Sequence, residues 1–189
     1  MVTTHAFKGS AFLKEVMSDA PGAERIVHCL QCGSCGGSCP NGSDMQYTPR
    51  GVFALINADE RDKVLESNTM WFCVSCYLCT TRCPQNIPIT EIMYALKRLA
   101  IAEGKAKDTD APALAKTFTD MVEKFGRSFE LGLASYYYLL NKPFALPKMM
   151  PMALSMFTRG RMSLIPTKIR RVDQLRAIIQ KAKELGGAS

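Results

Sequence analysis

The eight cysteines of the sequence fall into two blocks with the same spacing. The first block is Cys29, Cys32, Cys35 and Cys39, followed by Pro40, and the second is Cys73, Cys76, Cys79 and Cys83, followed by Pro84. Each block reads C-x-x-C-x-x-C-x-x-x-C-P, which is the run that binds [4Fe–4S] clusters in two-cluster ferredoxins. Three thiolates at two-residue gaps fit three corners of an iron–sulfur cube. The sequence therefore predicts two [4Fe–4S] clusters.

In a run of this kind the fourth cysteine binds the neighbouring cluster. We therefore expect crossed ligation, in which cluster 1 is bound by Cys29, Cys32, Cys35 and Cys83, and cluster 2 by Cys73, Cys76, Cys79 and Cys39. Structural zinc and disulfides are the alternatives, because both also use cysteine pairs. Zinc sites commonly take two separated pairs of ligands, whereas each block here places four cysteines within eleven residues.

The two loops differ in composition, which predicts different reduction potentials. The first loop contains Gly33, Gly36 and Gly37, which allow backbone N–H groups to approach cluster sulfurs, and Arg82 precedes a ligand of cluster 1. The second loop is bulkier, with Val74, Ser75, Tyr77 and Leu78. Hydrogen bonds and positive charge stabilise the more negative reduced state, so we expect cluster 1 to have the higher potential.

Helical periodicity surrounds both blocks, and no alternating run predicts a strand. Ser10 is a candidate cap for a helix up to residue 20, Thr48 with Pro49 begins another, and a short helix is expected over 59–67. Thr90 is expected to cap a longer helix that ends at Gly104. The fold class predicted is all-α.

The polar residues 105–110 predict a domain boundary, with a cluster-binding domain over 1–104 and a helical extension over 105–189. Within the extension, residues 131–166 are rich in tyrosine, methionine and proline, and no acidic residue occurs between Glu130 and Asp173. Three interpretations stay open for this stretch. It packs as a helical hairpin on the cluster domain, it docks a partner protein, or it lies on a membrane surface, although its prolines argue against a long amphipathic helix.

Composition narrows the class of protein. The 47% hydrophobic content supports a packed core, and no apolar run is long enough to span a membrane. The N-terminus shows no secretory signal, so thiolate-bound iron indicates the cytoplasm. The formal net charge of +7 makes a nucleic-acid-binding protein with structural clusters the main alternative, but cluster thiolates offset part of that charge. We expect no nucleic-acid partner.

Residues for self-sufficient catalysis are not apparent. Neither histidine, His5 nor His28, has an obvious catalytic partner, and no phosphate-binding glycine loop occurs. The eight cysteines already complete two ligand sets, so His28 is expected to lie outside the ligand set. We expect an electron-transfer protein that transfers single electrons and breaks no substrate bond itself.

The two blocks, with Thr48-Pro49-Arg50 between them and residues 89–93 after them, resemble the C-type subunits of heterodisulfide reductases. The resemblance covers residues 25–105 and implies an α-helical ferredoxin domain with two [4Fe–4S] clusters. It implies a relay between a flavin-containing A-type subunit and a cysteine-rich B-type subunit in a redox complex. This chain has neither the C-C-G motif of the B-type subunit nor a flavin fingerprint, so it resembles the relay alone. Iron–sulfur subunits of glycolate and glycerol-3-phosphate dehydrogenases, and a membrane-linked relative, are also similar.

Overall fold

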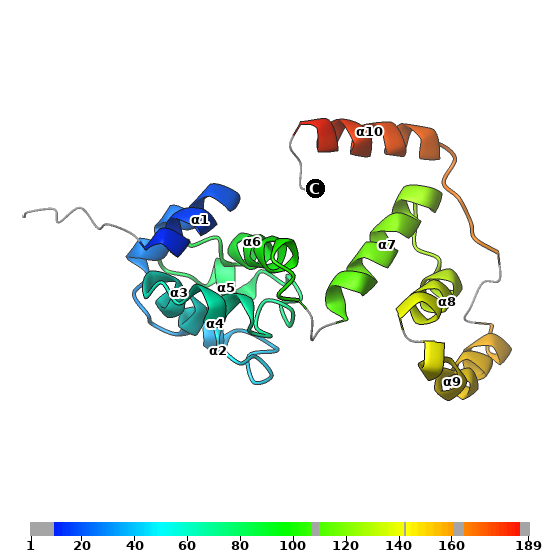
Figure 1. Ribbon diagram of the computed structural model, residues 1–189, viewed down its shortest axis with the longest axis horizontal. Coiled ribbons are helices and arrows are strands. Elements are labelled where there is room, and N and C mark those ends of the chain that lie inside the picture. The colour runs from blue at the N-terminus through cyan, green and yellow to red at the C-terminus, as the bar shows by residue number, and fades with distance from the viewer. Residues whose placement is uncertain (1–9, 107–109, 142, 161–164, 186–189) are drawn as a thin grey trace, which may run out of the picture. The chain divides into compact units, whose positions relative to one another are not determined.

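The computed structural model describes residues 10–106, 110–141, 143–160 and 165–185. Regular structure in these ranges is helical throughout, and none of the described residues lies in a strand, which confirms the all-α prediction. The chain forms two compact units, residues 1–109 and residues 110–189 (Figure 1).

The first unit contains six α-helices and one 3-10 helix among its described residues: α1 (Ala11–Asp19), η1 (Ala23–His28), α2 (Ser34–Gly37), α3 (Pro49–Asn57), α4 (Arg61–Leu65), α5 (Leu78–Thr81) and α6 (Ile89–Ala102). Helices α1, α3, α4 and α6 bury their apolar faces against one another and against η1. Large side chains from these elements are almost fully buried, among them Phe12, Ile26, Phe53, Ile56, Leu65, Ile92 and Leu96. This core holds the two cysteine loops at one side of the helices.

Two of the predicted helix starts are confirmed. Ser10 caps α1 by accepting a hydrogen bond from the Leu13 N–H at 3.0 Å, and its own hydroxyl donates to the Ile56 carbonyl at 2.7 Å. Thr48 caps α3 by accepting from the Gly51 N–H, with Pro49 in the first turn. Because Ser10 bonds to the last turn of α3, its cap also fixes α1 against α3.

The expectation that Thr90 caps α6 is wrong. The helix begins at Ile89, and Pro88, two residues before Thr90, occupies the cap position without a side-chain hydrogen bond. The proline ring has no acceptor for the N–H groups of the first turn, so an acceptor must come from another element. Thr90 is 1% exposed instead, and its N–H donates to the Thr80 hydroxyl at 3.3 Å.

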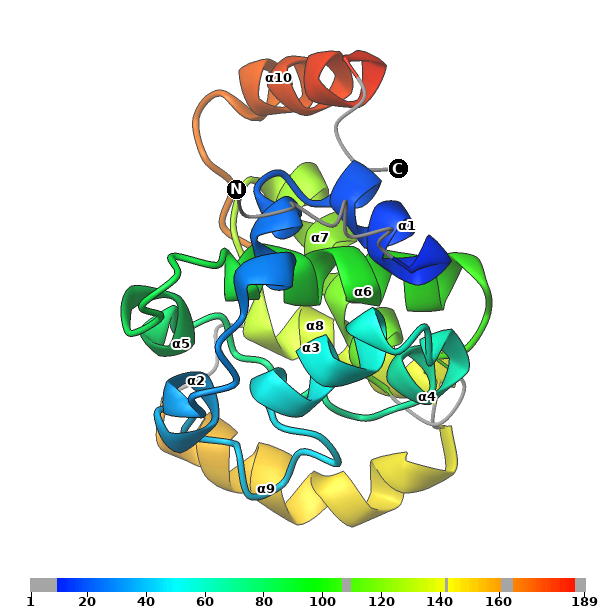
Figure 2. The ribbon, with the colours of Figure 1, turned by 90° about the vertical axis from the view of Figure 1, so that its left-hand side faces the viewer.

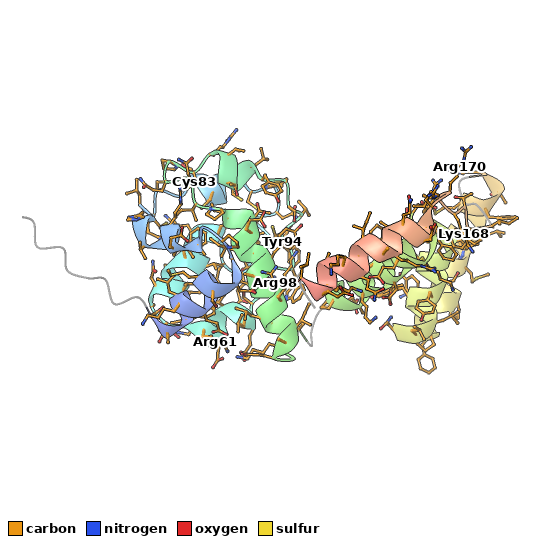
Figure 3. All side chains as sticks on the ribbon, turned by 90° about the horizontal axis from the view of Figure 1, so that it is seen from above. Arg61, Cys83, Tyr94, Arg98, Lys168 and Arg170 are labelled. Atoms are coloured by element: carbon orange, nitrogen blue, oxygen red, sulfur yellow. The ribbon has the colours of Figure 1, made fainter. Side chains whose placement is uncertain are left out.

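Charged side chains fasten three helices of the first unit. The Arg61 guanidinium donates two hydrogen bonds to the Glu15 carboxylate of α1, at 2.7 and 2.8 Å, and it also pairs with Glu103 after α6. These hydrogen bonds from Arg61 lower the pKa values of both carboxyl groups. From α6, Arg98 bonds to Asp19 at the end of α1 (Figure 3).

The second unit contains α7 (Ala111–Phe125), α8 (Glu130–Asn141), η2 (Pro143–Ala145), α9 (Leu146–Thr158) and α10 (Val172–Glu184). Helix α7 ends at Gly126, which takes a left-handed φ of +78°. Arg176 of α10 donates to the carbonyls of Glu123 and Lys124, which fixes α10 to the end of α7.

The stretch 131–166 holds no single long helix among its described residues, because α8 ends before Pro143 and α9 is a separate helix of 13 residues, although α9 itself continues through Pro151. Proline has no N–H, and α9 therefore continues without the hydrogen bond that residue 151 would donate to the preceding turn. Among the residues that the structure describes, no helix has both the length and the apolar character needed to cross a bilayer.

Candidate iron–sulfur centre

The two cysteine blocks fold alike and lie next to each other. Each has an extended loop through its first two cysteines and then one short helix that carries the third, Cys35 in α2 and Cys79 in α5. Helices α2 and α5 are in contact and lie side by side (Figure 2). This arrangement brings the fourth cysteine of each block close to the loop of the other.

The first cavity, between the first loop and the segment after α5, is lined by Cys29, Cys32, Cys35 and Cys83. Its cavity volume is about 20 Å³, and Phe53, Ile87 and Ile89 form its apolar walls. Cys35 is buried, Cys32 is exposed, and the other two thiols are half-buried. The structure thus gathers the four cysteines that the sequence assigned to cluster 1.

The second cavity is lined by the other four cysteines, Cys73, Cys76, Cys79 and Cys39. Its cavity volume is about 20 Å³, and its walls are largely apolar, with Met45, Pro49, Ile89 and Met93. Ile89 lines both cavities, so they are neighbours separated by one buried side chain. Among the described residues, no three His, Cys, Asp or Glu side chains are grouped closely enough to hold a single metal ion.

Polar groups at the first cavity come from three elements. The Gln31 amide donates to the Cys29 sulfur at 3.4 Å, and the Ser34 hydroxyl lies 3.4 Å from the Cys32 sulfur. The Ser34 contact lowers the pKa of the Cys32 thiol, whereas burial raises that of Cys35. Arg50 of α3 lines the cavity and contributes a positive charge. The first cavity is thus lined by hydrogen-bond donors and by a cation.

The polar and charged groups around the second cavity differ from those around the first. Burial raises the pKa of the Cys79 thiol, and hydrogen bonds with the hydroxyls of Thr80 and Thr90 act in the opposite direction. Tyr77 lines the cavity, and its hydroxyl donates to the Glu91 carboxylate at 2.9 Å. A carboxylate is therefore bonded to a residue of this wall, whereas a guanidinium lines the first cavity.

A lysine approaches the second loop from outside the cavity. The Lys97 ammonium of α6 donates to the Cys73 backbone carbonyl at 3.2 Å and lies 5.4 Å from the centroid of the Tyr94 ring. Lys97 does not line the cavity, whereas Arg50 does line the first one. The two cavities thus differ in the charge at their walls, with Lys97 offsetting part of the difference.

Sequence reasoning placed the wrong arginine at the first cavity. Arg82 is exposed, donates to the Ser38 hydroxyl at 3.3 Å, and does not line the cavity, whereas Arg50 does. Pro49 marks the start of α3, which lies beside the first loop. This proline is the sequence signal that could have placed Arg50 at the first cavity. Thr80 and Thr90 were also missed as partners of Cys79. His28 is exposed and lines neither cavity.

The loop glycines have separate roles. Gly33 takes a φ of +81°, which glycine adopts without strain. A Cβ added to Gly36 would lie 3.2 Å from the Cβ of Thr48, so the absence of a side chain allows α2 to approach α3. A Cβ on Gly37 would meet nothing within 4 Å. The prediction that these glycines let backbone N–H groups approach cluster sulfurs stays a prediction.

The part of the chain that contains both cavities is similar to a known protein family. Residues 13–87 match the 4Fe-4S dicluster domain family. This match and the eight cysteines support two [4Fe–4S] clusters as the cofactors of the chain. The matched residues include all eight cysteines, both short helices and most of the residues that line the two cavities.

The chain is also similar to the C-type subunits of heterodisulfide reductases, which confirms that resemblance. It is 33% identical over 85 residues to the C-type component of a H(2):CoB-CoM heterodisulfide,ferredoxin reductase of Methanothermobacter marburgensis, covering 45% of this chain and 46% of the relative. It is 42% identical over 81 residues to the C 2 iron-sulfur component of a CoB–CoM heterodisulfide reductase of Methanocaldococcus jannaschii, 42% of each chain. The C-type component of a Ferredoxin:CoB-CoM heterodisulfide reductase of Methanosarcina mazei is 38% identical over 79 residues, 42% of this chain and 48% of the relative. The chain thus matches less than half the length of these relatives.

Proposed function

We propose that this chain is the electron-transfer iron–sulfur subunit of a heterodisulfide reductase-like complex. The observation that carries the proposal is the pair of adjacent cavities, each surrounded by three cysteines of one block and the fourth of the other. Single electrons would enter at one cluster and leave from the other. The chain would hold the two clusters at a fixed separation, with Ile89 between them.

We propose that Cys29, Cys32, Cys35 and Cys83 bind cluster 1 and that Cys73, Cys76, Cys79 and Cys39 bind cluster 2. Four thiols around each cavity match the four iron corners of a cubane, and the apolar walls limit access of water. When bound, each cluster supplies a one-electron couple. The chain contributes burial, hydrogen bonds to sulfur and nearby charges, which together set the reduction potential.

The relatives are named as subunits of reductases, and we propose the same kind of assembly for this chain. The expected partners are a flavin-containing subunit and a cysteine-rich catalytic subunit. Iron bound by thiolates requires a reducing compartment, and for that reason we propose the cytoplasm.

The second unit offers a surface for docking a partner subunit. Phe144 is 97% exposed, and Met150, Met152, Leu154 and Phe157 of α9 are also exposed. Lys148 is the one charged residue within α9, so this helix has no charged face of the kind that helices on a lipid surface show. Exposed methionine and phenylalanine support contact with a protein, because these residues are enriched in interface cores. Lys168 and Arg170 lie before α10, with the Lys168 ammonium 5.9 Å from the centroid of the Phe125 ring at the end of α7, and they add basic charge to the same unit (Figure 3).

The test is anaerobic purification of the full chain, alone and co-expressed with candidate flavin-containing and cysteine-rich subunits. We expect brown protein with about eight irons per chain and EPR signals from two reduced clusters. We also expect co-elution with both subunits. Folded protein without iron would refute the relay, and tight, salt-sensitive binding of nucleic acid in place of these subunits would favour the nucleic-acid alternative.

A further inference from the structure

The two cysteine loops adopt the same backbone conformation with different residues. In each loop the residues on either side of the second cysteine have positive φ, namely Gln31 and Gly33 in the first and Ser75 and Tyr77 in the second. Gly33 adopts its φ of +81° freely, whereas Tyr77 holds a φ of +62° with a bulky side chain. Left-handed backbone is strained for such a residue, and strain kept at a functional site indicates a role for the side chain.

The Tyr77 side chain is held in one place. Tyr77 is one of the residues that line the second cavity, and its hydroxyl donates to the Glu91 carboxylate, 2.9 Å away in the first turn of α6. The residue is 44% exposed, so the side chain contributes to the cavity wall and also reaches solvent. At the matching position of the first cavity, Gly33 offers no side chain. At this position the second cavity therefore has a side chain where the first cavity has none.

We propose that Tyr77 is a positioning residue that acts as a lid over cluster 2, and that Glu91 holds the lid closed. This assignment rests on the proposed ligation of cluster 2 by Cys39, Cys73, Cys76 and Cys79. The ring excludes water and dissolved oxidants from the cluster, and the Glu91 carboxylate adds negative charge beside it. Both effects disfavour the more negative reduced state, so the lid keeps the potential of cluster 2 low.

The test compares three variants of the anaerobically loaded full chain. Tyr77→Gly removes the ring and relieves the backbone strain. Ser75→Gly is the matched control, because it relieves a φ of +55° in the same loop and leaves the ring in place. Tyr77→Phe keeps the ring and removes the hydrogen bond to Glu91.

Two readouts report access to each cluster. A water-soluble dysprosium chelate broadens the EPR signal of a reduced cluster that it can approach. Ferricyanide takes electrons from a cluster one at a time, becoming ferrocyanide, and the over-oxidised cluster loses its colour. A Cys39→Ser variant identifies the signal of cluster 2, and cluster 1 serves as the reference within each molecule.

We expect Tyr77→Gly to increase the broadening and the bleaching rate of cluster 2 several-fold and to raise its potential, with cluster 1 unchanged. Ser75→Gly should behave as wild type, and Tyr77→Phe should fall between. Unchanged access in Tyr77→Gly, or an equal increase in Ser75→Gly, would overturn the lid alone. A wild-type protein without iron would overturn the proposed function as well. Should Tyr77→Gly fold poorly, Tyr77→Asn provides the same comparison, because asparagine tolerates positive φ.

Discussion

At the scale of single residues, the two clusters differ in the charge at their cavity walls. Arg50 lines the first cavity, and Glu91 holds Tyr77 at the second. A cation stabilises the reduced cluster and a carboxylate destabilises it, so we predict the higher potential for cluster 1. An EPR-monitored redox titration measures both potentials, and Cys83→Ser perturbs the signal of cluster 1. The prediction fails if the unperturbed signal is the one with the higher potential.

Arg50 itself provides a second prediction. Arg50→Gln removes the positive charge from the first cavity while keeping a polar side chain. An exposed charge contributes roughly 0.5–1 kcal/mol, so the potential of cluster 1 should fall by roughly 20–40 mV. Arg82→Gln is the control, because Arg82 bonds to Ser38 and lies outside the cavity lining. Equal shifts in both variants would show a general effect of net charge instead.

The sequence was enough to group the eight cysteines but not to find their neighbours. The ligand spacing is local, so a repeated pattern reveals it directly. Arg50 and Thr90 reach the cavities through the packing of α3 and α6 against the loops, and Thr80 of α5 bonds to Cys79 at the second cavity. Pro49 is a local signal for the position of Arg50, whereas no local pattern indicates the contacts of the two threonines. The sequence predicts that Tyr77 makes the second loop bulkier. Its positive φ depends on a loop conformation that the residue types alone do not reveal.

At the scale of helices, the contact between α2 and α3 depends on one missing side chain. Gly36→Ala would place a Cβ 3.2 Å from the Cβ of Thr48, whose position is fixed because Thr48 caps α3. We expect a loss of roughly 1–3 kcal/mol in the free energy of unfolding and weaker retention of cluster 1. Gly37→Ala is the matched control, since its Cβ meets nothing within 4 Å. Urea unfolding and iron content measure both effects, and equal behaviour of the two variants would contradict the packing argument.

The Arg61 ion pairs predict a characteristic pH dependence. The pKa values of Glu15 and Glu103 are lowered, so the stability that Arg61 contributes is present above the ordinary glutamate value of about 4.3 and is lost as pH falls through the lowered values. Arg61→Gln should lower the melting temperature by roughly 2–5 °C. The difference from wild type should stay constant between about pH 8 and pH 6, because these carboxyl groups are ionised throughout. Thermal melts across that range test this, and a difference that varies there would implicate another group.

Local sequence signals predicted the presence of the helices better than they predicted the residues at which the helices begin and end. The caps of α1 and α3 were predicted because serine and threonine bond to nearby N–H groups. The start of α6 was predicted too late, because Pro88 and not Thr90 occupies the cap position. Thr90 lies within the first turn, and its N–H donates to the Thr80 hydroxyl. Helix α9 was unexpected because propensity argues against Pro151, and the helix tolerates one missing hydrogen bond.

At the scale of the whole molecule, the clusters and the exposed apolar helix belong to different units. The core and both cavities lie within residues 1–109. A chain ended after Ala106 should therefore fold and bind about eight irons, as the full chain does, but fail to assemble with partner subunits. Iron analysis and size-exclusion chromatography of the co-expressed proteins measure the two properties. Loss of iron on truncation would show that the second unit supports cluster binding.

Each cavity takes three sulfurs from one block and the last from the other, and this exchange has a consequence for maturation. Neither half of the domain contains a complete set of four ligands, because a chain cut between Pro40 and Cys73 would leave three cysteines of one cavity separated from the fourth. Both blocks must therefore be folded against each other before either cavity has its full set of four thiols.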